Sequence, residues 1–314
     1  MSLSSDTKQE LSRIIPEKKC CMLAEIAGFI RVCGSIRLAG GGKFKIVTVT
    51  ENAAVARHYK QLLKKYFKID AGLEVGQSES LRKRRIYMIT IGPDQLSEQI
   101  LRETGIFMIR EGMDYISDGI YDGVIKTKCC RKAYLRGLFL GAGTITNPEK
   151  GYHFEIVTST ETLAGDTKKL INSFVDLHAK VASRKKSYVT YVKDSGQIKD
   201  ILAIMGAHSQ YFTFEDVVLT KEMRNAANRQ SNCDQANIDK ALATSSRQIS
   251  AIKKIAESEG LRSLPEKLRI TALLRLENPE ATLEQLGEML DPPMKKSGIN
   301  KRLKRIEEIA EKIK

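Results

Sequence analysis

The stretch "KCCRKAYLRGLFLGAGTI", Lys128–Ile145, decides the fold of this 314-residue chain. A second stretch, "KCCMLAEIAGFIRVCGSI" from Lys19, aligns with it without gaps, and Lys, Cys, Cys, Ala, Gly, Gly and Ile are identical. Both copies read as apolar helices with small residues. Gly28 and Gly137 occupy matching positions, where a missing side chain lets two backbones approach closely. The sequence therefore predicts two similar halves that pack through these helices.

The repeat continues beyond the helices. "IVTVTENAA" from Ile46 matches "IVTSTETLA" from Ile156, and "RKRRIYMITI" from Arg82 resembles "SRKKSYVTYV" from Ser183. In each half an apolar helix precedes two strands, an amphipathic helix beginning near residue 51 or 161, two more strands (around 73–91 and 180–193) and a closing helix. We predict an α+β fold of αββαββα units, repeated about a pseudo-two-fold axis.

Charge indicates the kind of partner. The 52 Lys and Arg residues outnumber 38 Asp and Glu, which gives a formal net charge of +14 and a pI near 9.4. This surplus favours nucleic acid over a membrane surface, since neither terminus reads as a basic amphipathic anchor. No run approaches the ~18 apolar residues that a membrane span needs, and the polar N-terminus lacks the apolar centre of a signal peptide. We expect a cytoplasmic, nucleoid-associated protein.

The cysteines form two adjacent pairs, Cys20–Cys21 and Cys129–Cys130, with Cys33 and Cys233 apart from them. Zinc ligands are usually separated by two-residue gaps, which these pairs lack, and the four histidines are scattered. Reduced, mostly buried thiols are the first interpretation, and a zinc ion bridging the two pairs is the alternative. We expect no metal and no cofactor.

Strand patterns end near Phe214, and helical patterns continue to the C-terminus. "KEMRNAANRQSNCDQANIDKALATSSRQISAIKKIAES" predicts one or two long helices. "SLPEKLRITALLRLE" predicts another helix, with Ser263 and Glu266 as its capping box and Pro265 at its first position.

A helix-turn-helix unit is predicted at residues 282–314. "TLEQLGEML" (282–290) begins with Thr282 and Gln285 as a capping box and places three leucines on one face. Gly287 supplies the small residue needed where the two helices of such a unit cross. "DPPMKK" interrupts the chain for longer than the usual turn, and Ser297 is the expected N-cap of the last helix.

The last helix has an apolar face and a basic face. At about 100° per residue, a narrow arc holds Ile299, Leu303, Ile306, Ala310 and Ile313. Basic residues between positions 295 and 305 lie largely on the other side, with no acid among them. A recognition helix needs such an arrangement, with its apolar face on partner helices and its basic face in the major groove. The predicted DNA-binding residues are Lys295, Lys296, Ser297, Asn300, Lys301, Arg302, Lys304 and Arg305.

Side-chain chemistry assigns roles within this set. Lys301 and Arg305 suit guanine edges, and Asn300 suits adenine. Lys295 and Lys296 suit phosphates. The alternative is an ordinary surface helix with a solvated basic face.

The first two thirds of the chain resemble the LAGLIDADG homing endonucleases. "LRGLFLGAG" (Leu135–Gly143) resembles their motif directly, and "IAGFIRVCG" (Ile26–Gly34) is a weaker, aligned copy. In those nucleases an acidic residue before the final Gly holds divalent cations over the scissile phosphates. Here these positions are Cys33 and Ala142, which lack the oxygen ligands that Mg²⁺ prefers. Glu25 is about 12 Å further up the helix, so we expect no catalytic residues and no enzymatic activity.

Basic clusters lead into matching strands of the two halves. In the nucleases that the chain resembles, the sheet lies along the major groove. These clusters either contact phosphates or form a solvated basic face. Because acidic residues lie between them, we expect the main affinity for DNA in another part of the chain. The candidate secondary DNA contacts are Arg82, Lys83, Arg84, Arg85, Arg184, Lys185 and Lys186.

Nearly the whole chain resembles the WhiA family of Gram-positive bacteria. The most specific pieces are "KCCRKAYLRGLFLGAGTITNPE", "YHFEI", "GAHS", "RNAANRQSNCDQAN" and "KSGINKRLKRIEEIAEKI". The resemblance implies a DNA-binding regulator associated with sporulation, cell division and chromosome segregation. It also implies a C-terminal module similar to region 4 of bacterial sigma factors, which reads promoter DNA.

Three domains are expected: LAGLIDADG-like halves at 1–122 and 123–214, and an all-α domain at 215–314. We predict a non-catalytic, sequence-specific transcriptional regulator that binds double-stranded promoter DNA, with other regulatory proteins as second partners of the LAGLIDADG-like part. The alternatives are a metal-dependent LAGLIDADG endonuclease and an RNA-binding splicing factor on the same scaffold. A sensing or structural role for the first two domains is compatible with the main prediction.

Overall fold

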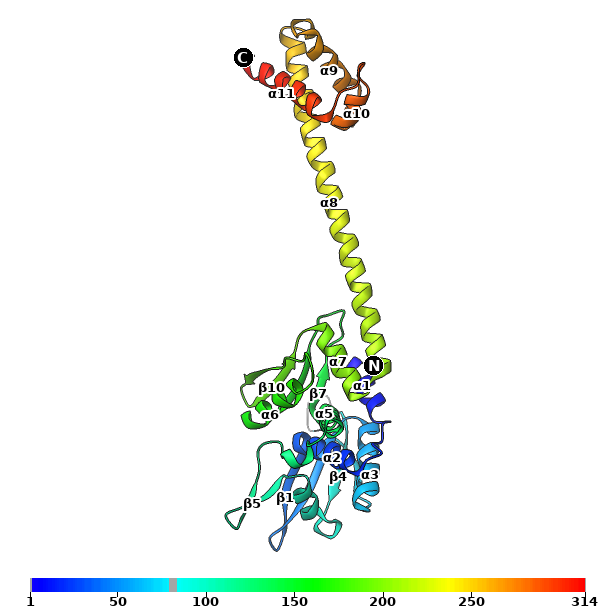
Figure 1. The fold of residues 1–314 in the computed structure, drawn as a ribbon, viewed down its shortest axis with the longest axis vertical. Helices are drawn as coiled ribbons and strands as arrows, with labels where there is room; N and C mark the ends of the chain where they lie inside the picture. The colour runs from blue at the N-terminus through cyan, green and yellow to red at the C-terminus, as the bar shows by residue number, and fades with distance from the viewer. Residues whose placement is uncertain (1, 79–83, 314) are drawn as a thin grey trace. The chain divides into compact units, whose positions relative to one another are not determined.

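The computed structural model describes residues 2–78 and 84–313. The chain divides into two compact units, Met1–Lys221 and Glu222–Lys314. The first unit is α+β and the second is built from helices (Figure 1). In the described part of the chain, no helix combines the length and apolar character that crossing a membrane would take.

The first half of unit 1 follows the predicted order. Its elements are α2 (Lys19–Cys33), β1 (Gly34–Gly40), β2 (Lys43–Thr50), α3 (Ala53–Phe67), β3 (Gly72–Gln77), β4 (Arg85–Ile91) and α4 (Ser97–Glu103). The strands form an antiparallel sheet in the order β1-β2-β4-β3. Ile46 of β2 pairs with Ile91 of β4, and both side chains are buried.

The second half repeats this arrangement. Its elements are α5 (Lys128–Ala142), β7 (Gly143–Ile145), β8 (Phe154–Thr158), α6 (Glu161–Asn172), β9 (Lys180–Arg184), β10 (Ser187–Val192) and α7 (Ser195–Met205). The sheet order β7-β8-β10-β9 is equivalent to that of the first half. Ile156, the repeat partner of Ile46, is likewise fully buried. The predicted pair of αββαββα units is confirmed.

Several elements of unit 1 were not predicted. Helix α1 (Leu3–Leu11) precedes the first repeat, and the hairpin of β5 (Phe107–Arg110) and β6 (Met113–Ile116) lies between the repeats. Short 3₁₀ turns, η1 (Pro93–Gln95) and η2 (Asp122–Val124), complete the connections.

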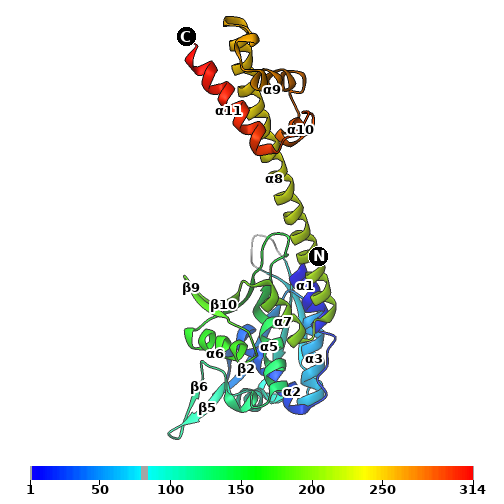
Figure 2. The ribbon, with the colours of Figure 1, turned by 45° about the horizontal axis from the view of Figure 1, so that its top comes forward.

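Helices α2 and α5 lie side by side at the centre of unit 1 (Figures 1 and 2). A side chain at Gly28 would collide with the backbone oxygen of Tyr134, and one at Gly137 with that of Glu25. The expected close approach through these two glycines is therefore confirmed. Because the neighbouring atoms belong to the backbone, they cannot move aside without separating the helices.

A buried ionic network joins the two halves. Glu25 on α2 contacts His58 Nε2 through Oε1 at 2.7 Å, and its Oε2 accepts hydrogen bonds from Arg136 Nε and Nη2 at 2.9 and 2.6 Å. Arg136, on α5, also donates to the carbonyl of Met205 at 3.0 Å. All three ionisable side chains are buried, so removal of one partner would leave an uncompensated charge.

Unit 2 contains most of the 51-residue helix α8 (His208–Ser258), with η3 (Leu261–Ser263), α9 (Glu266–Glu277), α10 (Leu283–Glu288) and α11 (Lys296–Lys312). The last three helices gather around the C-terminal part of α8 (Figure 2). Their core contains Ile252 and Ile255 of α8, Leu286 of α10, and Ile299 and Leu303 of α11. The long polar stretch thus forms one helix, one of the two predicted outcomes.

Two predicted helix caps are wrong. Ser263 Oγ donates to the carbonyl of Gly260 at 2.8 Å instead of capping α9, because it belongs to the 3₁₀ turn before Leu264. Pro265 is the N-cap residue of α9, and no side chain there makes a capping hydrogen bond. Ser297 is already inside α11, whose N-cap is Lys295.

Candidate nucleic-acid interface

Helices α10 and α11 form the expected helix-turn-helix frame. The hydroxyl of Thr282 accepts a hydrogen bond from the Gln285 amide at 3.3 Å, and Gln285 Oε1 accepts one from the Thr282 amide at 2.8 Å. This reciprocal capping box confirms the predicted start of α10. Leu286 is fully buried and Leu290 is nearly so, as the predicted apolar face requires.

Gly287 determines how closely the chain passes between the two helices. A side chain at this position would collide with the carbonyl oxygen of Met294, and Ile299 of α11 lies next to the same point. The Met294 amide donates to the Gly287 carbonyl at 2.9 Å. The interruption after α10, although longer than usual, therefore folds back onto α10.

The two faces of α11 are divided as predicted. Ile299, Leu303 and Ile306 have relative exposures of 0%, 0% and 1%, whereas Lys301, Lys304 and Arg305 are exposed. Ile299 and Leu303 hold the helix against the core of unit 2, so the orientation of the basic face is set by packing.

The N-terminus of α11 carries Lys295, Lys296 and Ser297, which are all exposed. In the described chain no side chain caps this end of the helix. Unpaired backbone N–H groups and the helix dipole favour an anion there, and the two lysines add to the effect. A groove beside this end is lined by Lys295, Lys296 and Asn300 on one side, and by Glu284 and Glu288 of α10 on the other.

The predicted DNA-binding residues are not equivalent. Arg302 turns toward α9, where Nη1 lies 3.3 Å from Thr271 Oγ1 and 3.5 Å from the Lys267 carbonyl. Arg305 pairs with Glu308 Oε2 at 2.7 Å, an exposed ion pair that costs little to break. Asn300 is half-buried at the groove.

Two of the five described candidate secondary contacts, Arg84 and Arg184, pair with acids. Arg82 and Lys83 lie outside the described residues. Arg84 Nη1 contacts Glu51 Oε2 at 2.8 Å, and Arg184 Nη2 contacts Glu155 Oε2 at 2.9 Å. The side chains of Arg85, Lys185 and Lys186 are exposed. Lys185 and Lys186 form the turn between β9 and β10, so these two candidates lie at a hairpin end.

The position equivalent to the nuclease metal site lies beside Lys8 on α1. The Cys33 thiol donates to the Phe29 carbonyl at 3.0 Å, and burial raises its pKa. Burial lowers the pKa of Lys8 to about 8, while attraction from Cys33 and Glu51 acts in the opposite direction. The ammonium group lies 5.8 Å from the ring centroid of Phe139 on α5.

Sequence reasoning missed Lys8 because it did not include α1. Two signals were present: Ser2, whose hydroxyl accepts the Ser5 amide at 3.3 Å, and the four-residue spacing of Leu3, Thr7 and Leu11. Thr7 and Leu11 are both fully buried. A short helix with so few apolar residues is hard to distinguish from a polar terminus.

The structure thus defines a class: a duplicated LAGLIDADG-like scaffold joined to a helical unit with a helix-turn-helix. Three family models match the chain. They are the WhiA N-terminal LAGLIDADG-like domain at residues 19–107, the WhiA LAGLIDADG-like domain at 131–224 and the WhiA C-terminal HTH domain at 227–310. The chain belongs to the WhiA family.

Full-length relatives agree with this assignment. The chain is 45% identical, over 100% of its length and 98% of the relative's, to a protein of Thermoanaerobacter pseudethanolicus named "Probable cell division protein WhiA". A protein of the same name from Alkaliphilus metalliredigens is 43% identical over 99% of this chain and 98% of its own. The crystal structure of full-length DUF199/WhiA from Thermatoga maritima superposes with a TM-score of 0.60 at 28% identity, covering 100% of this chain and 99% of that one.

Proposed function

We propose that this protein is a non-catalytic, sequence-specific transcriptional regulator that binds promoter DNA through α11. Its proposed processes are cell division, chromosome segregation and sporulation, and its proposed location is the nucleoid. The observation that carries the proposal is the basic face of α11, exposed on a capped helix-turn-helix frame. The names of the relatives, which include cell division, and the match to the WhiA C-terminal HTH domain support it.

Different residues of α11 have different roles in this proposal. Lys301 and Arg305 reach base edges from the exposed face, and Arg305 gives up its ion pair with Glu308 to do so. Lys295 and Lys296, together with the uncapped N-terminus of α11, bind a backbone phosphate of the DNA. Arg302 positions α11 against α9, since its guanidinium faces Thr271 and the Lys267 carbonyl.

The scaffold is proposed not to cleave DNA. Cys33 and Ala142 supply no oxygen ligand for a hard divalent cation, and Lys8 is near enough for its positive charge to act at Cys33. Glu25 is engaged with His58 and Arg136. In the proposed division, residues 1–122 and 123–214 form a scaffold for regulatory proteins and for weak secondary DNA contacts, and residues 215–314 hold the main DNA interface.

The test begins with a duplex selected from a random pool by the full-length protein. Lys301→Ala and Arg305→Ala should each weaken the free energy of binding to this duplex by about 1–3 kcal/mol, and that to unrelated duplexes by much less. Lys295→Ala and Lys296→Ala should weaken binding to both equally and make it less sensitive to salt. Lys312→Ala, an exposed lysine in the last turn of α11, is the matched control and should leave binding unchanged.

Salt dependence and competition provide independent measurements. If about six phosphates are contacted, affinity should fall roughly a thousandfold between about 50 and 200 mM salt. Structured RNA should compete poorly with the selected duplex, and incubation with Mg²⁺ or Mn²⁺ should leave the DNA intact. Equal effects of all four α11 substitutions on selected and unrelated duplexes would contradict base reading by this helix, and strand breaks would contradict the non-catalytic assignment.

A further inference from the structure

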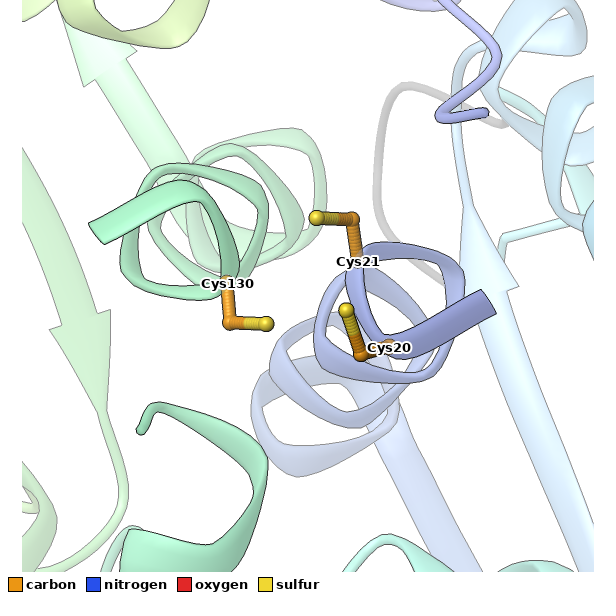
Figure 3. Close-up of side chains that lie close together, drawn as sticks. All are labelled: Cys20, Cys21 and Cys130. Atoms are coloured by element: carbon orange, nitrogen blue, oxygen red, sulfur yellow. The ribbon is translucent and has the colours of Figure 1, made fainter. Parts of the chain in front are cut away.

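Three thiols converge at the N-terminal ends of the central helices. Cys20 and Cys21 lie in the first turn of α2, and Cys130 lies in the first turn of α5. Their sulfur atoms all lie within 4.8 Å of one another. Figure 3 shows the Cys130 side chain directed toward α2, with Cys20 and Cys21 on that helix. Among the His, Cys, Asp and Glu side chains of the described residues, these three lie close enough together to share a metal ion.

A fourth thiol adjoins the cluster. Cys129 precedes Cys130 on α5, and it lines the same surface groove as Cys21. Its sulfur is also 3.1 Å from Thr127 Oγ1, so the Thr127 hydroxyl can orient it. Each half of the scaffold therefore brings a Cys–Cys pair to the junction of α2 and α5, and the sulfurs within 4.8 Å of one another are those of Cys20, Cys21 and Cys130.

The spacing of the Cys20, Cys21 and Cys130 sulfurs is close to that between ligands of a tetrahedral thiolate centre. Zinc binds thiolates at about 2.3 Å in a tetrahedron, which separates the sulfurs by about 3.8 Å. The sulfurs of Cys20, Cys21 and Cys130 are at most 4.8 Å apart, so side-chain rotations that shorten these separations by roughly 1 Å reach that spacing. Sulfur ligands select borderline and soft cations, such as zinc, over Mg²⁺.

The electrostatic surroundings suit an anionic centre. A divalent cation with four thiolates carries a net charge of −2, and the N-termini of α2 and α5 both carry partial positive charge. Lys18 and Lys19 precede Cys20, and Lys128 precedes Cys129. Lys18 is near enough to influence the Cys129 thiol electrostatically. These positive groups compensate the net negative charge that remains after the cation has neutralised two of the four thiolates.

A cation can reach the cluster from solvent. Cys20 is exposed, and Cys21 and Cys129 line a surface groove with Pro16 and Lys132. Cys21 and Cys130 are themselves buried, so an ion held there would be largely shielded from water. An open path on one side and buried ligands on the other are what a structural metal site needs.

We propose that Cys20, Cys21, Cys129 and Cys130 bind one thiophilic divalent cation of the zinc class, which cross-links the two halves of the scaffold. The site is separate from the proposed DNA interface and does not depend on it. The competing fate of the same thiols is oxidation to disulfides, in which two thiols lose two electrons and two protons to an oxidant.

Cobalt(II) is the probe, because tetrahedral sulfur coordination gives it sulfur-to-metal charge-transfer bands and intense visible absorption. Reduced, metal-free full-length protein is titrated without oxygen. One equivalent of Co²⁺ should bind with these bands, and Zn²⁺ should displace it. Zinc should also protect four of the six cysteines from alkylation, as mass spectrometry would count.

Cys20→Ser and Cys130→Ser should each weaken cobalt binding by at least about tenfold, since even outer-shell substitutions cost 10–100-fold. Cys233→Ser, on exposed α8, is the matched control and should bind cobalt like the parent. Circular dichroism verifies that each variant is folded. The proposal is overturned if the parent shows no charge-transfer band, if the band survives in folded Cys21→Ser/Cys130→Ser protein, or if the thiols form disulfides and the reduced protein has no affinity for metal.

Discussion

At the scale of the residue, Lys8 brings a desolvated ammonium group from a helix outside the repeats. Burial lowers its pKa to about 8 from the ordinary value of 10.5. Between these two pH values the unfolded chain binds more protons than the folded chain, so this group makes folding more favourable as pH rises. Below about pH 8 the amine is charged in both states, and its burial destabilises the fold.

Lys8→Met should therefore increase the free energy of unfolding near pH 7 by about 2 kcal/mol at most. The gain should shrink as pH rises from about 8 toward 10.5, where wild-type Lys8 is neutral in the fold. Urea unfolding at about pH 7 and pH 10 measures the change. Lys65→Met, an exposed lysine on α3, is the control. A gain that does not vary with pH would show that charge burial at Lys8 is not its cause.

The thiols and Glu25 show what residue-level reading captures and what it misses. The sequence showed that positions 33 and 142 lack an acid, and it showed that Glu25 lies too far along the helix from Cys33 to replace one. The engagement of Glu25 by His58 and Arg136 was not, because the three residues come from three different helices. The rule of two-residue gaps placed separate thiols ahead of the bridging alternative, since that rule assumes that neighbouring ligands share one chain segment, whereas Cys20, Cys21 and Cys130 come together from two helices.

At the scale of the element, the contact of α2 with α5 depends on two glycines. Gly137→Ala places a methyl group against the Glu25 carbonyl and the Phe29 amide, so the helices must separate. We expect a loss of at least about 2 kcal/mol in the free energy of unfolding, the order of magnitude for overpacking in a rigid site.

Gly165→Ala is the matched control for that substitution. Gly165 also lies within a helix, α6, but an added methyl group there meets no atom within 4 Å. Alanine should stabilise this position by about 0.5–1 kcal/mol through its helix propensity. Thermal and urea unfolding compare the two variants. Equal effects of the two substitutions would contradict close packing at Gly137.

Element order was predictable, whereas helix ends were predictable only in part. Alternating residues and the duplicated sequence were enough to predict both αββαββα units. The capping box at Thr282 was found because both partners are local. The start of α9 was misplaced because Ser263 belongs to a 3₁₀ turn. The start of α11 was misplaced because tertiary packing sets it: its N-cap, Lys295, follows Met294, whose amide donates to the carbonyl of Gly287 on α10. Helix α1 and the β5–β6 hairpin have no repeat partner to reveal them.

At the scale of the whole molecule, each unit has its own hydrophobic core. The division of α11 into buried and basic faces was predicted from sequence periodicity, and the structure confirms it. The turning of Arg302 toward α9 was not predictable, since a helical wheel does not show the neighbouring helix. The roles of the individual basic residues in DNA binding remain part of the proposal.

The central proposal is that the main affinity for DNA belongs to unit 2. The most direct measurement compares the selected duplex bound by the full-length protein and by the fragment Glu222–Lys314, after circular dichroism shows that the fragment is folded. Gel-shift titration in the presence of Mg²⁺ reports both affinity and the integrity of the DNA. We predict that the fragment binds within about tenfold of the full-length affinity, with a similar slope against salt, and that the duplex stays intact. A folded fragment that fails to bind a duplex held tightly by the full-length protein would contradict the proposal.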